Sequence, residues 1–168
     1  MPLPSMTQKE QAAYQQAQEI ITNCLRKGKN GTFINLGVLG LTQVPPEIGQ
    51  LSALLKLYLD ENQLTSLPPE IGQLPTLREL HLTSNRLTSL PQQIGQLSSL
   101  TGLFLYNNQL TSLPQQIDQL TSLRELDARQ NQLTTLPPEI GSLRSLIVLS
   151  FGDNQLTILP PEKVGSQN

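Results

Sequence analysis

The chain has 168 residues, 37% of them hydrophobic, one histidine, one cysteine and a formal net charge of −2 at pH 7. These values predict one soluble domain. The chain has 11 Lys and Arg against 13 Asp and Glu, so it lacks the excess of basic residues that binds a phosphate backbone. We therefore expect no nucleic-acid partner. No run approaches 18 continuous apolar residues, and we expect no membrane partner.

Residues 1–30 are predicted to form an N-terminal capping helix, from about Gln8 to Lys27. The stretch Thr7-Gln8-Lys9-Glu10 has the spacing of a capping box. An apolar stripe follows at helical spacing, made of Ala13, Ala17, Ile20 and Cys24 and widened by Ile21 and Leu25. We expect this stripe to cover the first layer of the segment that follows. A partner-binding or membrane-surface helix is the alternative, which the Gln-rich polar face disfavours.

Residues 31–168 are predicted to form a solenoid of six units. Leu77 to Leu90 reads L-x-x-L-x-L-x-x-N-x-L-x-x-L, and this frame recurs every 23 residues, from Gly31, Leu54, Leu77, Leu100, Leu123 and Leu146. Such a period is the signature of leucine-rich repeats, which fold only when stacked. The expected fold class is α/β: a right-handed leucine-rich-repeat solenoid with a parallel β-sheet on its concave face and short helical turns on its convex face.

Positions within one unit have different predicted roles. In a strand that covers Glu79 to Leu82, alternate leucines point into the core and the residues between them point out. The ninth position holds an Asn that we expect to form a structural ladder with unpaired backbone groups, at Asn62, Asn85, Asn108, Asn131 and Asn154. On the convex side, Pro69 suits the first position of a short turn and Gly72 its end.

The outward positions predict a protein-binding patch. The fifth position of the units carries Asn35, Tyr58, His81, Phe104, Asp127 and Ser150. An aromatic centre with a charged rim is typical of protein interfaces. We therefore predict that a protein or peptide binds the concave face at Tyr58, His81, Phe104, Tyr106, Lys56, Glu79, Asp127 and Arg129. The alternative is that the aromatic residues only stabilise cross-strand packing.

Catalysis, metal binding and a cofactor are not expected. His81 is the only histidine and lies far from Cys24 in the repeat geometry, so no nucleophile–base pair can be assembled. A structural or ice-binding role is the further alternative. It rests on a column of hydroxyls at Thr42, Thr65, Thr88, Thr111, Thr134 and Thr157. We interpret this column as threonines that bond local backbone.

The ends of the solenoid are less regular. The first unit begins with Gly31 and has Leu39 in place of Asn, as expected beneath a cap. In the last unit Lys163 replaces the expected Ile, so the final layer is left open. Three explanations stand: a longer natural protein, shielding by Phe151 and the tail, or a homodimer through this end. A single cysteine and no visible targeting segment favour the cytoplasm.

The repeat pattern, L-T-x-L-P-x-x-I-x-x-L-x-x-L-x-x-L-x-L-x-x-N-x-L, resembles the leucine-rich repeats of Ras-group-related and small bacterial proteins. It covers residues 31–168, and the stretch from Leu64 to Leu74 is especially similar. The resemblance implies a non-catalytic interaction scaffold without disulfide caps, or a segment of a larger multidomain signalling protein. The near-identical units also resemble recent duplication or consensus design, whereas the irregular concave column favours a natural sequence.

Overall fold

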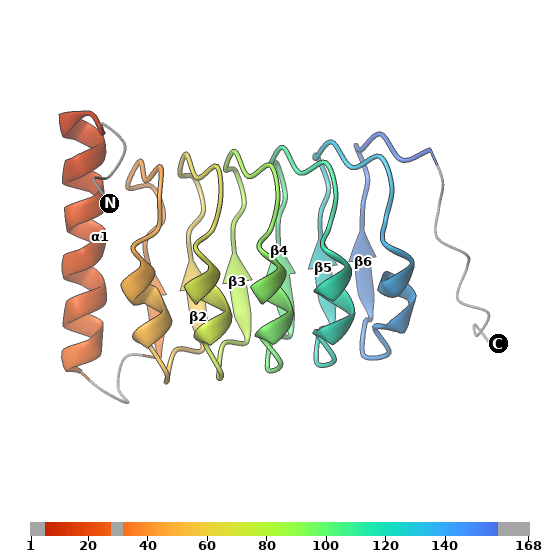
Figure 1. Ribbon diagram of the computed structural model, residues 1–168, viewed down its shortest axis with the longest axis horizontal. Coiled ribbons are helices and arrows are strands. Elements are labelled where there is room, and N and C mark those ends of the chain that lie inside the picture. The colour runs from red at the N-terminus through yellow and green to blue at the C-terminus, as the bar shows by residue number, and fades with distance from the viewer. Residues whose placement is uncertain (1–5, 28–31, 158–168) are drawn as a thin grey trace.

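The computed structural model describes residues 6–27 and 32–157. A helix, α1 (Gln8–Arg26), lies across one end of a row of short strands and 3-10 helices (Figure 1). Gly31 and the tail from Pro160, which the sequence singled out, lie outside the described residues. The elements that follow α1 are β1 (Phe33–Asn35), η2 (Pro46–Gln50), β2 (Lys56–Tyr58), η3 (Pro69–Gln73), β3 (Glu79–His81), η4 (Gln92–Gln96), β4 (Gly102–Phe104), η5 (Gln115–Gln119), β5 (Glu125–Asp127), η6 (Pro138–Ser142) and β6 (Val148–Ser150).

The six strands form one parallel sheet in sequence order, with the 3-10 helices on the opposite side (Figure 1). Adjacent strands pair in a register of one whole unit, so that Leu57 lies opposite Leu80 and Leu80 opposite Leu103. Each unit therefore places the same position in the same column. This arrangement confirms the predicted solenoid.

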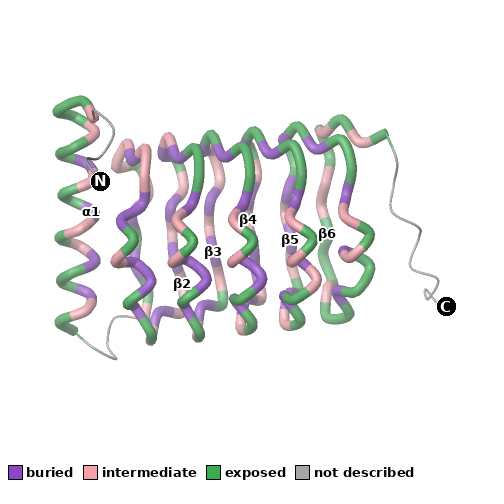
Figure 2. Tube along the Cα trace, viewed as in Figure 1, coloured by how far each residue is buried: buried purple, intermediate pink, exposed green. Residues whose placement is uncertain are grey.

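The core is a continuous stack of leucine layers. Leu80 and Leu82 are fully buried, whereas Glu79 and His81 of the same strand are half-buried on the outside. Figure 2 shows the buried residues running through β2 to β5 and ending before β6, where Val148 and Leu149 are exposed. The last layer is thus open among the described residues.

The helix α1 joins this core through Ala13, Ala17, Ile21 and Cys24. Ala13, Ala17 and Cys24 are buried as predicted, but Ile21 is fully buried in place of Ile20, which is only partly buried. The capping box is present: the Thr7 N–H donates to Glu10 Oε2 (2.7 Å) and the Glu10 N–H donates to Thr7 Oγ1 (3.3 Å). The helix ends at Arg26, one residue before the predicted end.

The convex turns begin as predicted and end differently. Pro69 is the first residue of η3, where a missing N–H costs nothing. The predicted end at Gly72 is wrong: the turn ends one residue later, at Gln73, and Gly72 does not have a positive φ. It lies inside η3, and a Cβ there would sit 2.5 Å from the carbonyl oxygen of Gln93 in the next turn. The glycine allows close approach between units.

Left-handed backbone of residues other than glycine occurs instead at the position before each ladder asparagine and before Leu39, which takes the place of the asparagine in the first unit. This column contains Val38, Glu61, Ser84, Asn107, Gln130 and Asp153, with φ between 51° and 61°. The polar members tolerate the conformation better than the β-branched Val38, whose side chain is 72% exposed. The turn out of each strand is therefore a repeated bend, and its first copy carries an unfavourable residue.

Candidate protein-binding face

The asparagine ladder is engaged within the fold. Asn85 Nδ2 donates to the carbonyl oxygens of Leu59 (2.9 Å) and Leu82 (3.1 Å), and its Oδ1 accepts the N–H of Leu64 (3.1 Å). Equivalent bonds are made by Asn62, Asn108, Asn131 and Asn154. These amides serve the turns and are not available to a ligand.

Three rings stack on the concave face. The centroids of Tyr58 and His81 are 4.5 Å apart with planes at 24°, and those of His81 and Phe104 are 4.5 Å apart at 19°. The parallel register causes this, because it sets the fifth positions of β2, β3 and β4 side by side. The rings are half-buried by one another, so the stack is less exposed than the sequence suggested.

Gly102 makes room for the end of this stack and was missed by the sequence reasoning. A Cβ on Gly102 would lie 2.9 Å from Cε2 of Phe104, so the ring lies over the glycine. The available signal was a glycine at a strand position where the neighbouring units carry Lys56, Glu79 and Glu125.

An ion pair between Lys56 and Glu79 contacts His81, the middle ring of the stack. Lys56 Nζ lies 2.9 Å from Glu79 Oε1, and Glu79 Oε2 lies 3.2 Å from His81 Nε2. The hydrogen bond from Lys56 is the largest cause that lowers the pKa of the Glu79 carboxyl, and the bond from His81 acts in the same direction. The same pair raises the pKa of Lys56. Glu79 is therefore charged at neutral pH and orients His81.

Tyr106 belongs to a second cluster. The Arg129 guanidinium lies 5.4 Å from the centroid of its ring and binds Asp127 through two bonds, Nη2 to Oδ2 (2.6 Å) and Nε to Oδ1 (2.9 Å). Arg129 lowers the pKa of the Asp127 carboxyl, mainly through these side-chain bonds. The predicted aromatic patch thus divides into a ring stack and a Tyr106–Arg129–Asp127 cluster.

Phe33 is a further concave residue that the sequence reasoning overlooked. It lies on β1 opposite Lys56, and its side chain is 67% exposed. The signal was its place at the third position of the unit, beside the fifth position on which the prediction concentrated. It adds an apolar group to the concave face next to α1.

The described residues offer no metal-binding cluster of three or more His, Cys, Asp or Glu side chains. The thiol of Cys24 lies on the buried face of α1, and burial raises its pKa, which disfavours the reactive thiolate. Within the described ranges, no helix has the length and apolar character needed to cross a bilayer.

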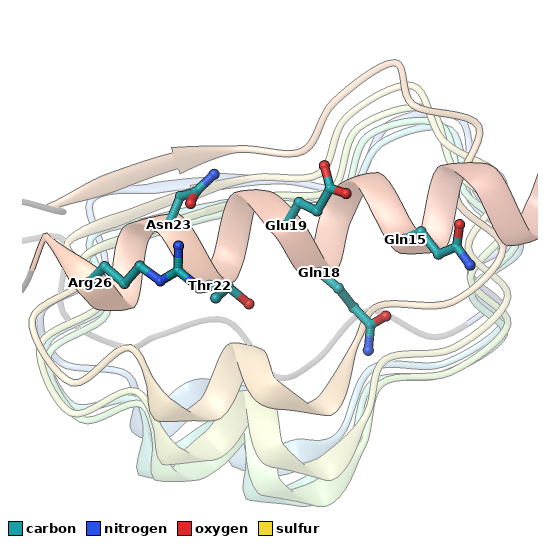
Figure 3. Close-up of a pocket in the computed structure, with 6 residues that line it drawn as sticks. All are labelled: Gln15, Gln18, Glu19, Thr22, Asn23 and Arg26. Atoms are coloured by element: carbon teal, nitrogen blue, oxygen red, sulfur yellow. The ribbon is translucent and has the colours of Figure 1, made fainter.

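A hollow of about 580 Å³ follows the outer side of α1. Its six polar side chains spread along the helix and do not converge on one point (Figure 3), which gives no ligand geometry. They are Gln15, Gln18, Glu19, Thr22, Asn23 and Arg26.

Parallel strands stacked in register, with an internal asparagine ladder and a bare concave sheet, define a leucine-rich-repeat solenoid. Family models agree: one described as "Leucine rich repeat" matches residues 75–133, and one described as "Leucine Rich repeats (2 copies)" matches residues 52–93. Together these matches span residues 52–133 and show a leucine-rich repeat protein. Comparison with curated proteins gave no match.

Solved structures with this fold include YopM from Yersinia enterocolitica WA-314, with 30% identity and a TM-score of 0.69 over 95% of this chain and 31% of that one. The plant peptide hormone receptor RGFR1 in complex with RGF2 is 36% identical, with a TM-score of 0.68 over 76% of this chain and 22% of that one. The ectodomain of the Arabidopsis thaliana receptor kinase GASSHO1/SCHENGEN3, in complex with CASPARIAN STRIP INTEGRITY FACTOR 2, is 32% identical, with a TM-score of 0.66 over 73% and 15%. The chain spans less than a third of each of these proteins.

Proposed function

We propose that this chain is a non-catalytic interaction module that binds a protein or peptide across its concave face. The Tyr58–His81–Phe104 stack supplies the apolar centre, and the Asp127–Arg129 and Lys56–Glu79 pairs orient the partner. Leucine-rich repeats in general mediate protein–protein interaction, which supports the class of function.

The ring stack carries this proposal. Its three rings already hold one another in place, so a partner that covers them loses little side-chain entropy on binding. Aromatic residues held rigid in this way are the usual energetic centre of an interface. The plant peptide hormone receptor RGFR1, which is similar in fold, is solved in complex with RGF2, and this favours a peptide or protein ligand for the present chain.

Affinity capture from source-cell lysate tests the proposal. The wild-type chain is compared with Tyr58→Ala/Phe104→Ala and with a convex control, Gln92→Ala/Gln115→Ala, after circular dichroism shows that all three fold alike. A partner retained by wild type and control and lost by the concave variant supports the proposal. Equal capture by all three, or capture by none, would reject the concave site.

The proposal also covers context. We place the protein in the cytoplasm, either as a separate scaffold or as a segment of a larger signalling protein.

Two copies pair through the open layer at β6, where Ile147 is 77% exposed and Val148 and Leu149 are also exposed. Sedimentation equilibrium tests the pairing: the wild type should dimerise and Ile147→Lys should not, and a monomeric wild type would exclude it.

Ice binding is the second candidate, because one observation favours it. The interpretation that the column threonines bond local backbone is wrong for most of them: within the described hydrogen bonds, only Thr157 makes such a side-chain bond, from Oγ1 to the carbonyl of Thr134 (3.4 Å). The hydroxyls of Thr65, Thr88, Thr111 and Thr134 lie on exposed residues without one. Thermal hysteresis that is lost in Thr88→Lys/Thr111→Lys would support this function, and its absence in the wild type would remove it.

A further inference from the structure

The strand β1 has hydrogen-bonding groups on one edge that no strand uses. Toward β2, the Leu36 N–H donates to the Tyr58 carbonyl (2.8 Å), and the Thr32 carbonyl accepts from Lys56 (3.1 Å). Alternate residues of a parallel strand bond to opposite sides, so the peptide groups of Phe33 and Asn35 point away from β2. None of the hydrogen bonds among the described residues uses the backbone N–H or C=O of these two residues.

The neighbouring strand β2 shows which hydrogen bonds the outer edge of β1 lacks. In β2 the residue equivalent to Asn35 is Tyr58, whose carbonyl accepts from the preceding strand. The same relation repeats down the sheet, where the carbonyls of His81 and Phe104 accept from Leu59 and Leu82. The free edge of β1 therefore has the pattern of donors and acceptors that a preceding strand would fill.

A groove runs beside this edge. It has a volume of about 380 Å³ and lies between β1 and the second half of α1. Ile20, Asn23 and Lys27 line it from the helix, and the exposed ring of Phe33 lines it from the strand. In Figure 3, β1 (pale orange, upper left) runs along α1 and Asn23 points toward it. The helix covers the first core layer and leaves the strand edge accessible.

The occupant of such a groove follows from its chemistry. Donors and acceptors repeat along β1 at two-residue intervals, about 6.6 Å, which an extended backbone matches. Phe33 and Ile20 favour an apolar side chain at the centre of the segment, and Lys27 favours an acidic group at one end. The site is also continuous with the concave sheet, so one partner can reach both.

We propose that the groove between α1 and β1 is a peptide-binding site, in which an extended apolar segment of a partner protein pairs with the free edge of β1 and adds a seventh strand to the sheet. The site does not depend on the ring stack of β2 to β4. Either binding site can therefore fail in experiment without the other.

Phage selection with random peptides of about eight residues on the full chain, followed by amide exchange with the best synthetic peptide, tests this site. Saturating peptide should slow exchange of the Phe33 and Asn35 amides at least about tenfold, because it converts free edge groups into hydrogen-bonded ones. The amide of Ile34, which faces β2, is the internal control and should change little. Selection that yields no binder protecting Phe33 and Asn35 overturns the proposal.

Peptide N-methylation separates strand pairing from simple apolar contact. Methylation of the residue whose N–H faces β1 should weaken binding at least about tenfold, whereas methylation of the next residue, whose N–H faces away, should be tolerated. On the protein, Phe33→Asp should lower the affinity of the peptide for the groove, and Tyr58→Ala should leave this affinity unchanged. Equal sensitivity at both peptide positions, or loss in Tyr58→Ala alone, would contradict strand addition.

Discussion

Val38 provides a test of how backbone strain enters the stability of this solenoid. Its φ of 61° is left-handed, and its side chain is 72% exposed. A left-handed conformation costs an ordinary residue about 1–2 kcal/mol, and a β-branched residue is at the upper end. Asparagine adopts this conformation more readily, and the exposed Val38 methyls contribute little burial. We expect Val38→Asn to raise the free energy of unfolding by about 1 kcal/mol.

Urea denaturation followed by circular dichroism measures this change, provided that the m-value stays constant. Ile147→Asn is the matched control, because Ile147 is also β-branched and 77% exposed but has no positive φ. The control should be neutral or destabilising. An unchanged or lower stability in Val38→Asn, or an equal gain in both variants, would refute the attribution to backbone strain.

Further predictions concern packing, the ladder and the ion pair. Gly72→Ala should lower the melting temperature, because its Cβ would meet a neighbouring carbonyl at 2.5 Å, whereas Gly141→Ala, with nothing within 4 Å, should not. Asn85→Ala should destabilise the fold by about 2–4 kcal/mol in urea titration, because the buried N–H of Leu64 and carbonyl of Leu59 would lose their hydrogen-bond partner. The hydrogen bond from Lys56 lowers the pKa of Glu79 below its ordinary value of 4.5. The ion pair therefore contributes its full amount to the free energy of unfolding above pH 4.5, and this contribution is lost as the pH falls through the pKa of the folded state. Glu79→Gln should therefore be less stable than wild type near neutral pH, and the two should converge in acid.

The repeat period made the register predictable, because side chains alternate along a strand and every unit has the same length. That was enough to place Tyr58, His81 and Phe104 side by side. It could not show that their rings stack face to face, because ring orientation depends on side-chain torsions and on the space that Gly102 leaves. Tyr106 was grouped with the rings by sequence spacing, and Arg129 draws it into a separate cluster.

Other differences between the sequence predictions and the structure arise where one residue type suits two structural roles. Glycine suits both a left-handed turn end and close packing, and only the spatial neighbour of Gly72 distinguishes them. One position of the α1 stripe was assigned to the wrong residue, because Ile20 and Ile21 are equally apolar and the position of the helix on the first layer decides which is buried. The free edge of β1 was invisible, since Phe33 and Asn35 carry no sequence mark of an unpaired backbone.

The asparagine ladder makes the length of this protein adjustable in whole units. Each amide connects its own unit only to the one before it, through partners 21 and 26 residues earlier in the chain. Excision of one or more complete internal units would leave every remaining amide with an equivalent partner, whereas a deletion that is not a whole number of units would shift the ladder out of phase. The binding face can therefore be lengthened or shortened by duplication, one strand or about 5 Å at a time, and different partner sizes can be matched without a new core.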